Sequence, residues 1–226
     1  MTERLSEPAV IVNFKAYPEV EGINALELAM ACASVSEESG KDIALCPPMT
    51  ELGLIARTVD VPVLSQNVDP KNPGSATGWV TPSMVKVCGA IGTLINHSEH
   101  KVSMDIIKGC VELSRGCGLV TVVCADNVSA AMEVAKFHPD FIAVEPPELI
   151  GGDISVTTAN PKIVEDTVNS VKSIDDSISI LCGAGVKTGD DVKIALELGA
   201  SGVLLASGVV KSKDPRSTLQ DLIKHL

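Results

Sequence analysis

The sequence has almost no aromatic residues and no long apolar run. Aromatic side chains make up 2% of the 226 residues, whereas hydrophobic residues make up 45%. The core must therefore be built from aliphatic side chains, which suits close-packed parallel strands. No apolar run reaches the about 18 residues of a membrane-spanning helix, and no stretch has the pattern of a signal peptide. We therefore expect a cytoplasmic protein with no membrane partner.

The chain also lacks a paired-cysteine motif and an excess of positive charge. Its seven cysteines are an odd number, none belongs to a Cys-x-x-Cys pattern, and most lie within apolar runs. This pattern favours buried free thiols in a reducing compartment. The formal net charge of −11 argues against nucleic acid as a partner. An anionic substrate would need local backbone N–H groups and a well-placed cation.

Short apolar segments alternate with amphipathic ones along the whole chain, without a linker or a break in composition. The expected strands are Ala9–Phe14, Ile43–Pro47, Val61–Gln66, Ala90–Asn96, Leu119–Cys124, Phe141–Glu145, Ser179–Cys182 and Gly202–Ala206. The clearest expected helices are Asn24–Ser39, Met104–Arg115, Asn160–Ser173 and Asp190–Leu198. Eight strand–helix units predict an α/β fold, a single (β/α)₈ barrel over residues 1–226. The alternative is an open doubly wound sheet, although no Gly-x-Gly-x-x-Gly follows the first strand.

Polar residues follow several of these strands, at the edge where a barrel presents its catalytic groups. Glu145 ends the sixth strand and is followed by two prolines and the pair Gly151-Gly152, a pattern typical of a hinged lid. His97 ends the fourth strand, and Asn13 and Lys15 end the first. Taken singly, these could be a solvated loop glutamate, a structural histidine and a surface lysine.

Small residues follow the seventh and eighth strands. The turns Gly183-Ala184-Gly185 and Ala206-Ser207-Gly208 would let backbone N–H groups approach an anion closely. In (β/α)₈ barrels the loops after these two strands often bind phosphate. The alternative is that small residues only allow tight packing of helix against strand.

Together these motifs resemble the triose-phosphate isomerase family, and in particular its compact archaeal branch. The resemblance is carried, in order along nearly the whole chain, by Asn13-x-Lys15, Ser65-Gln66-Asn67, His97-Ser98-Glu99, Glu145-Pro146 with Gly151, Gly183-Ala184-Gly185 and Ala206-Ser207. The chain departs from bacterial and eukaryotic members in three ways. Its lid has no tryptophan, Gly185 stands where they have a serine, and Ala206-Ser207 replaces a Gly-Gly pair.

The resemblance implies interconversion of dihydroxyacetone phosphate and D-glyceraldehyde 3-phosphate, in glycolysis and gluconeogenesis, without cofactor or metal. It implies that Glu145 is the base, that His97 hydrogen-bonds the carbonyl oxygen and shuttles its proton, and that Lys15 stabilises the developing charge. Asn13 would help to position the oxygens. Glu99 would orient His97 or pair with Lys15, unless it is only a carboxylate at a helix N-terminus. The residues implied in phosphate binding are Asn13, Lys15, Ile150, Gly151, Gly185, Ala206 and Ser207.

The resemblance also implies a homo-oligomer, with a tetramer favoured over a dimer. In the family, the loop after the third strand reaches into a neighbouring subunit. Here that loop carries Pro70, Pro73 and the single tryptophan, Trp79, which predicts a packed protrusion.

Two other kinds of barrel protein remain as alternatives, and so does a phosphosugar-binding protein without catalytic activity. A metal-dependent epimerase would need paired His and Asp ligands at several strand ends, whereas His100, His138 and His225 do not lie at strand ends. A Schiff-base aldolase would need a lysine within the sixth strand, and Phe141–Glu145 has none. A protein that only binds would have no use for a base.

A coupled isomerisation assay with and without a chelator separates these alternatives. We expect triose-phosphate isomerisation that continues at an unchanged rate in EDTA, because the chemistry needs only protein groups. Activity lost in EDTA and restored by a divalent metal would support the epimerase instead.

Overall fold

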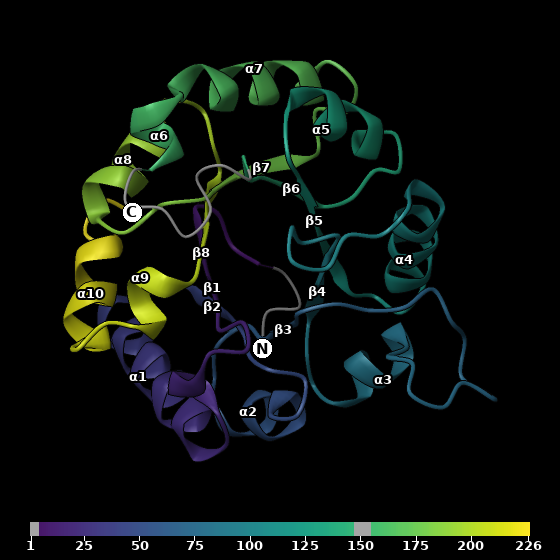
Figure 1. Cartoon of the computed structure of the whole chain (residues 1–226). Coiled ribbons are helices and arrows are strands. Elements are labelled where there is room, and N and C mark those ends of the chain that lie inside the picture. Colours follow the sequence, from purple (N-terminus) through teal and green to yellow (C-terminus); the bar gives the residue numbers. More distant parts are fainter. Residues whose placement is uncertain (1–4, 147–154) are drawn as a thin grey trace.

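Eight parallel strands form one sheet in the computed structural model, which describes residues 5–146 and 155–226. Figure 1 shows the sheet curled into a barrel, with the helices in a ring around it. The strands are β1 (Ala9–Asn13), β2 (Ile43–Cys46), β3 (Leu64–Ser65), β4 (Gly92–Ile95), β5 (Val120–Ala125), β6 (Phe141–Val144), β7 (Ser179–Gly183) and β8 (Gly202–Leu205). Their order in the sheet is β2-β1-β8-β7-β6-β5-β4-β3. The two end strands meet through a bridge between Leu45 and Val63, so the predicted (β/α)₈ barrel is confirmed.

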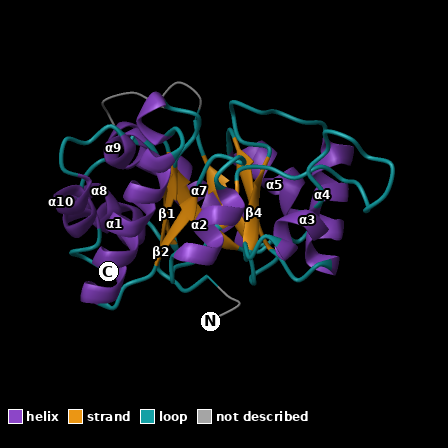
Figure 2. Cartoon of the chain, turned by 90° about the horizontal axis from the view of Figure 1, so that it is seen from below, coloured by secondary structure: helices purple, strands orange, loops and turns teal. Residues whose placement is uncertain are grey.

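Helices lie outside the strands along the barrel, as the side view shows (Figure 2). They are η1 (Pro18–Val20), α1 (Ile23–Ser39), α2 (Leu52–Thr58), α3 (Pro82–Val87), α4 (Met104–Gly116), α5 (Val128–Ala135), α6 (Val156–Ala159), α7 (Pro161–Lys172), α8 (Gly189–Glu197), α9 (Ser207–Val210) and α10 (Pro215–Leu222). The four expected helices correspond to α1, α4, α7 and α8. The others are at most eight residues long, too short for a helical period to stand out from the sequence.

Strand side chains alternate between two separate apolar cores. Inside the barrel, buried residues of the strands pack on one another, among them Ile11, Leu94, Ala143 and Leu181. Neighbouring residues on the same strands pack outward against the helices. This alternation puts Asn13 of β1 in the inward row that begins with Ala9 and Ile11.

The strand β3 is shorter than predicted. The sequence predicts a strand over Val61–Gln66, whereas the ladder covers only Leu64–Ser65. Pro62 has no N–H to give to a neighbouring strand, although its carbonyl accepts a hydrogen bond from the N–H of Leu45 at 2.9 Å. The prediction of a continuous third strand was therefore wrong at its start.

A long loop follows β3 and projects from the molecule (Figure 1). Its base is closed by Asp69, whose backbone N–H donates to the carbonyl of Val80 and whose carboxylate accepts from the N–H of Val80. Within the loop, the Lys71 ammonium lies 4.7 Å from the centre of the Trp79 ring. Trp79 is nevertheless 46% exposed, so the loop presents an aromatic surface to the outside.

All seven cysteines are free thiols, five of them buried, as predicted. Burial raises the pKa of the Cys32 and Cys182 thiols to about 12. Over the described residues, no helix combines the length and the apolar character needed to cross a bilayer.

Candidate active site

One pocket at the carboxyl ends of the strands brings together most of the predicted site residues. It opens to solvent. The predicted residues that line it are Asn13, Lys15, His97, Glu145, Gly185, Ala206 and Ser207. Glu99 lines a neighbouring pocket that shares Lys15 and His97 with the first. Ile150 and Gly151 lie outside the described residues.

Glu145 is a buried carboxylate at the end of the inward row of β6. Phe141 and Ala143 precede it in this row, and its backbone N–H donates to the carbonyl of Ala125 at 2.9 Å. The residue is 5% exposed, and no donor among the described residues hydrogen-bonds its Oε2 atom. Burial raises the pKa of this carboxyl, and the nearby His97, Cys124 and Lys15 partly oppose the shift. A carboxylate in this state is a stronger base than one in water.

A missing side chain on the adjacent strand makes room for this carboxylate. Gly183 of β7 lies beside the Glu145 side chain, and a Cβ atom added there would lie 2.4 Å from its Cγ. Any residue other than glycine would therefore displace the carboxylate from the pocket. On the β5 side, Cys124 occupies the inward row, and burial raises the pKa of its thiol well above the usual value.

His97 faces Glu145 across the pocket with its Nε2 atom 3.8 Å from Oε1. The backbone N–H of Glu99 donates to Nδ1 of the same ring at 3.2 Å. Because Nδ1 accepts this hydrogen bond, it carries no hydrogen of its own, and the hydrogen of the neutral ring is on Nε2. No helix begins directly after His97, because α4 begins only at Met104, so the turn at Glu99 fixes the ring.

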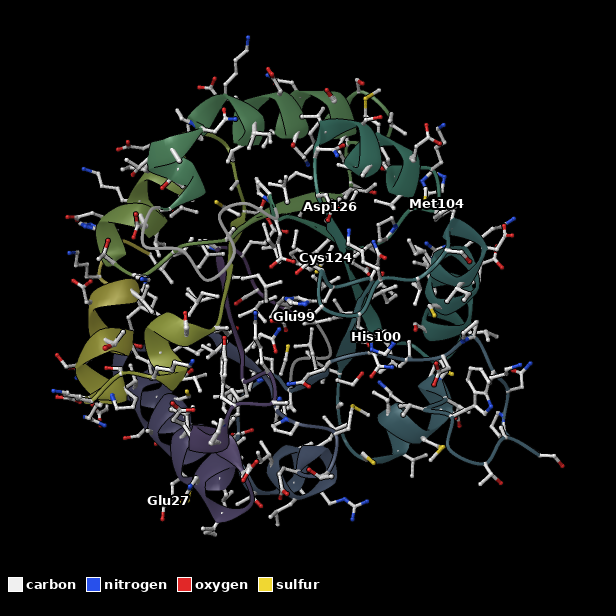
Figure 3. The ribbon with its side chains drawn as sticks, viewed as in Figure 1. Glu27, Glu99, His100, Met104, Cys124 and Asp126 are labelled. Carbon is white, nitrogen blue, oxygen red and sulfur yellow. The ribbon has the colours of Figure 1, made fainter. Side chains whose placement is uncertain are left out.

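Lys15 is held in a conformation that non-glycine residues seldom adopt. Its φ is 54°, and its N–H donates to Oδ1 of Asn13 at 2.9 Å. The amide of Gln66 donates to the carbonyls of Lys15 at 2.8 Å and Cys46 at 3.1 Å. The ammonium forms an ion pair with Glu99 at 2.8 Å, one of the two roles expected of that residue. Glu99 lies near the centre of the barrel view, as does Cys124 (Figure 3).

The turns after β7 and β8 form the other end of the pocket. Ala184 and Gly185 have φ values of 69° and 74°. The turn after β8 runs directly into α9, whose Val209 and Val210 N–H groups bond to the carbonyl of Ala206. The first N–H groups of a helix have no partner within it and are available to an anion.

Three residues of this site were not predicted as such. Gln66 appeared only within a loop motif, although a polar residue at the end of the third strand could have identified it. Tyr17 and Lys187 line the pocket beside the two turns. Lys187 lies two residues after Gly185, and a cation this close to an anion-suited turn was a usable indication.

No group of three or more His, Cys, Asp or Glu side chains within residues 5–146 and 155–226 is arranged to hold a metal ion. The arrangement instead offers a base, a neutral hydrogen-bond donor, an ammonium group and an anion-suited turn around one cavity.

Comparisons with known proteins identify close relatives over the whole length of the chain. The family model described as triosephosphate isomerase matches residues 8–226. Triosephosphate isomerase from Methanopyrus kandleri is 48% identical over 227 residues, which cover 98% of this chain and 99% of the relative. The protein of the same name from Methanocaldococcus jannaschii is 46% identical over 96% of this chain and 99% of its own. A crystal structure of triosephosphate isomerase from Bartonella henselae has a TM-score of 0.75 at 19% identity, covering 97% of this chain and 100% of that one, and supports the fold alone.

The buried carboxylate predicts that the Glu145→Gln variant is more stable than the natural protein near neutral pH. The pKa of Glu145 is higher in the folded protein than in the unfolded chain, where it is near 4.5. The free energy of unfolding therefore falls as the pH rises from the unfolded pKa to the folded pKa. We expect Tm at pH 7 to rise by at least ~2 °C, the shift that ~1 kcal/mol produces in a chain of this size. The difference should shrink towards pH 4.

Glu27→Gln is the matched control, because Glu27 is exposed on the outer face of α1 (Figure 3). Its Tm should follow that of the natural protein at both pH values. Equal or lower stability of Glu145→Gln at pH 7 in calorimetry would contradict a costly desolvated carboxylate.

Proposed function

The chain belongs to the triosephosphate isomerase family and is an isomerase, and we propose that it interconverts dihydroxyacetone phosphate and D-glyceraldehyde 3-phosphate by proton transfer through Glu145. The observation that carries this mechanism is the buried carboxylate that faces a neutral imidazole at 3.8 Å. A carbonyl compound bound beside this pair would be within reach of both a base and a hydrogen-bond donor.

The reaction begins when Glu145 takes the proton from the carbon next to the carbonyl. The electrons of that C–H bond form a carbon–carbon double bond, and the carbonyl oxygen becomes negative. The Nε2–H of His97 donates to this oxygen, and the ammonium of Lys15 stabilises the charge. Glu145 then returns its proton to the neighbouring carbon while His97 moves a proton between the two oxygens. No electron leaves the substrate, so aldose and ketose differ only in the positions of two hydrogens.

A neutral imidazole suits this role better than an imidazolium does. When Nε2 gives up its hydrogen, the imidazolate that remains binds protons strongly, as the enediolate oxygen does, so the proton can be shared and returned. The family's pairing of a glutamate base with a neutral histidine is an established example of such tuning. In this chain the feature that supports it is the Glu99 N–H at 3.2 Å from Nδ1.

The phosphate would lie at the turns after β7 and β8. Gly185, Ala206 and Ser207 line this end of the pocket, and we propose that their backbone N–H groups donate to the phosphate oxygens. Asn13 and Lys15 would contact the substrate from β1. We propose that Ile150 and Gly151 add N–H groups from the lid that the Glu145-Pro146-Pro147 and Gly151-Gly152 sequences suggest.

A phosphosugar-binding protein without catalysis is the weaker candidate. Binding alone would not require a carboxylate buried with an unbonded oxygen, an arrangement that costs stability. We further propose that the enzyme works in the cytoplasm, in glycolysis and gluconeogenesis.

Replacement of Glu145 by glutamine removes the base and keeps the size of the side chain. We expect kcat to fall by about 10²–10⁴-fold, the usual contribution of a positioned acid or base. A coupled assay in both directions measures it, with Glu27→Gln as the control at full activity. Near-natural turnover of a folded Glu145→Gln variant would refute the mechanism.

We also propose that the protein is a homo-oligomer, and a tetramer rather than a dimer. The projecting loop supports this, because it presents Trp79 with 46% of its surface exposed. Light scattering at micromolar concentration should give a mass several times the 23.5 kDa of the chain. A stable and active monomer would contradict the proposal.

A further inference from the structure

We propose that Asn96 is a positioning residue of this site, which turns the His97 ring into the pocket and holds it there from the end of β4. The inference rests on the proposed function, because it names a residue on which the position of the proposed hydrogen-bond donor depends. The described residues that line the pocket and its neighbour do not include Asn96, so it acts through His97 and not on the substrate.

The backbone at Asn96 breaks the alternation of side chains along β4. Leu94 packs inside the barrel, and Ile95 packs outward against the helices. An extended residue at position 96 would continue this pattern and turn His97 outward, away from the pocket. Asn96 instead has a φ of 62°, and His97 lines the pocket with its Nε2 atom 3.8 Å from Oε1 of Glu145. The direction of the ring therefore depends on the backbone of one residue.

The side-chain amide of Asn96 continues the contact between β4 and β5 beyond the end of their ladder. The ladder pairs Ile95 with Val123, and the Nδ2 group of Asn96 then donates to the carbonyl of Cys124 at 2.9 Å. Cys124 is the β5 residue whose side chain lies beside Glu145. The residue before the proposed donor is thereby fastened to the strand position next to the proposed base.

The other end of the same amide closes the loop that follows β4. The Oδ1 atom of Asn96 accepts a hydrogen bond from the N–H of Val102 at 3.1 Å, six residues further along the chain. His97 and Glu99 both lie within this closed loop, and the N–H of Glu99 donates to the His97 ring at 3.2 Å. One side chain therefore fixes both ends of the segment that carries the proposed donor and its hydrogen-bond partner.

Asparagine meets the two requirements of this position together. It adopts positive φ more readily than most residues that have a side chain. A carbonyl can only accept and a backbone N–H can only donate, so one orientation of the Asn96 amide satisfies both of its partners. Glycine would adopt this φ but has no amide. Alanine would lose the amide and would also disfavour the backbone angle.

The test compares Asn96→Ala and Asn96→Gly with Asn127→Ala in isomerase kinetics, thermal unfolding and histidine NMR. Asn127 is an exposed asparagine before α5, whose side chain accepts from the N–H of Ala130 at 2.9 Å. It is not among the described residues that line either pocket. Asn127→Ala therefore removes a helix cap and lowers stability without changing the site.

For Asn96→Ala we expect kcat to fall about tenfold to a hundredfold with KM within about threefold, because a displacement of about 1 Å costs about a hundredfold. Asn96→Gly should lose less, about threefold to tenfold, because its backbone still turns His97 into the pocket. This variant tests the amide alone, in a conformation that glycine adopts without strain. Asn127→Ala should keep natural kinetics while its Tm falls.

Nitrogen-15 NMR of protein labelled at histidine reports the ring itself. The shifts of the ring nitrogens distinguish a nitrogen that carries hydrogen from one that does not, and the His97 signals are assigned by their absence in His97→Gln. We expect the Nε2–H form of His97 in the natural protein and in Asn127→Ala. Asn96→Ala should lose this preference, because the N–H of Glu99 no longer meets Nδ1.

Natural kcat and a natural His97 spectrum in both Asn96 variants would overturn the inference. An equal loss of kcat in Asn127→Ala would also overturn it, because lowered stability would then explain the effect. If the natural protein shows no isomerase activity, the proposed function fails. The His97 spectra then decide separately whether Asn96 positions the ring.

Discussion

The burial of one carboxylate is the constraint on which the rest of this site depends. Glu145 is 5% exposed, and no described residue hydrogen-bonds its Oε2 atom, so its charged form is costly and its pKa is raised. The groups around Glu145 accommodate this buried side chain. Gly183 leaves space for the side chain, and His97 faces it with its Nε2 atom 3.8 Å from Oε1. Burial therefore makes the Glu145 carboxylate a stronger base and lowers the stability of the folded protein.

The alternation of side chains along the barrel strands directs this carboxylate into the pocket. The inward rows of β1 and β6 end in the polar side chains of Asn13 and Glu145, above an apolar interior. The rows of β5 and β7 end in Cys124 and Gly183 beside Glu145. Turns with unusual backbone angles then place the groups that the alternation of strand side chains cannot place. Positive φ values at Lys15, Asn96 and Ala184 turn the chain out of its strands. Hydrogen bonds from Gln66 and Glu99 hold two of these turns. In our account, the barrel positions the base, and the turns position the acid, the cation and the phosphate.

Much of this could be predicted from the sequence, because period-two apolar rows show which strand ends carry polar groups. Glu145 follows Phe141 and Ala143 with regular spacing, so its inward direction was predictable. His97 was harder, since Ile95 packs outward and continued alternation would turn His97 away; the αL residue Asn96 breaks that row. Two further contacts could not be predicted from local sequence patterns. The hydrogen bond from the Glu99 N–H to the His97 ring depends on turn geometry, and the contact of Gln66 with Lys15 depends on long-range packing. The third strand was predicted too long, because Pro62 within Val61–Gln66 has no N–H to give to a ladder.

The central claim is that burial makes Glu145 a stronger base than an ordinary glutamate. Carbon-13 NMR of protein labelled at the glutamate side-chain carboxyl carbon follows its titration directly, with the resonance assigned by its absence in Glu145→Gln. The account predicts a midpoint above 4.5 in the folded, ligand-free enzyme, while the Glu27 resonance serves as the exposed reference in the same spectra. A Glu145 midpoint at or below 4.5 in the folded protein would contradict it.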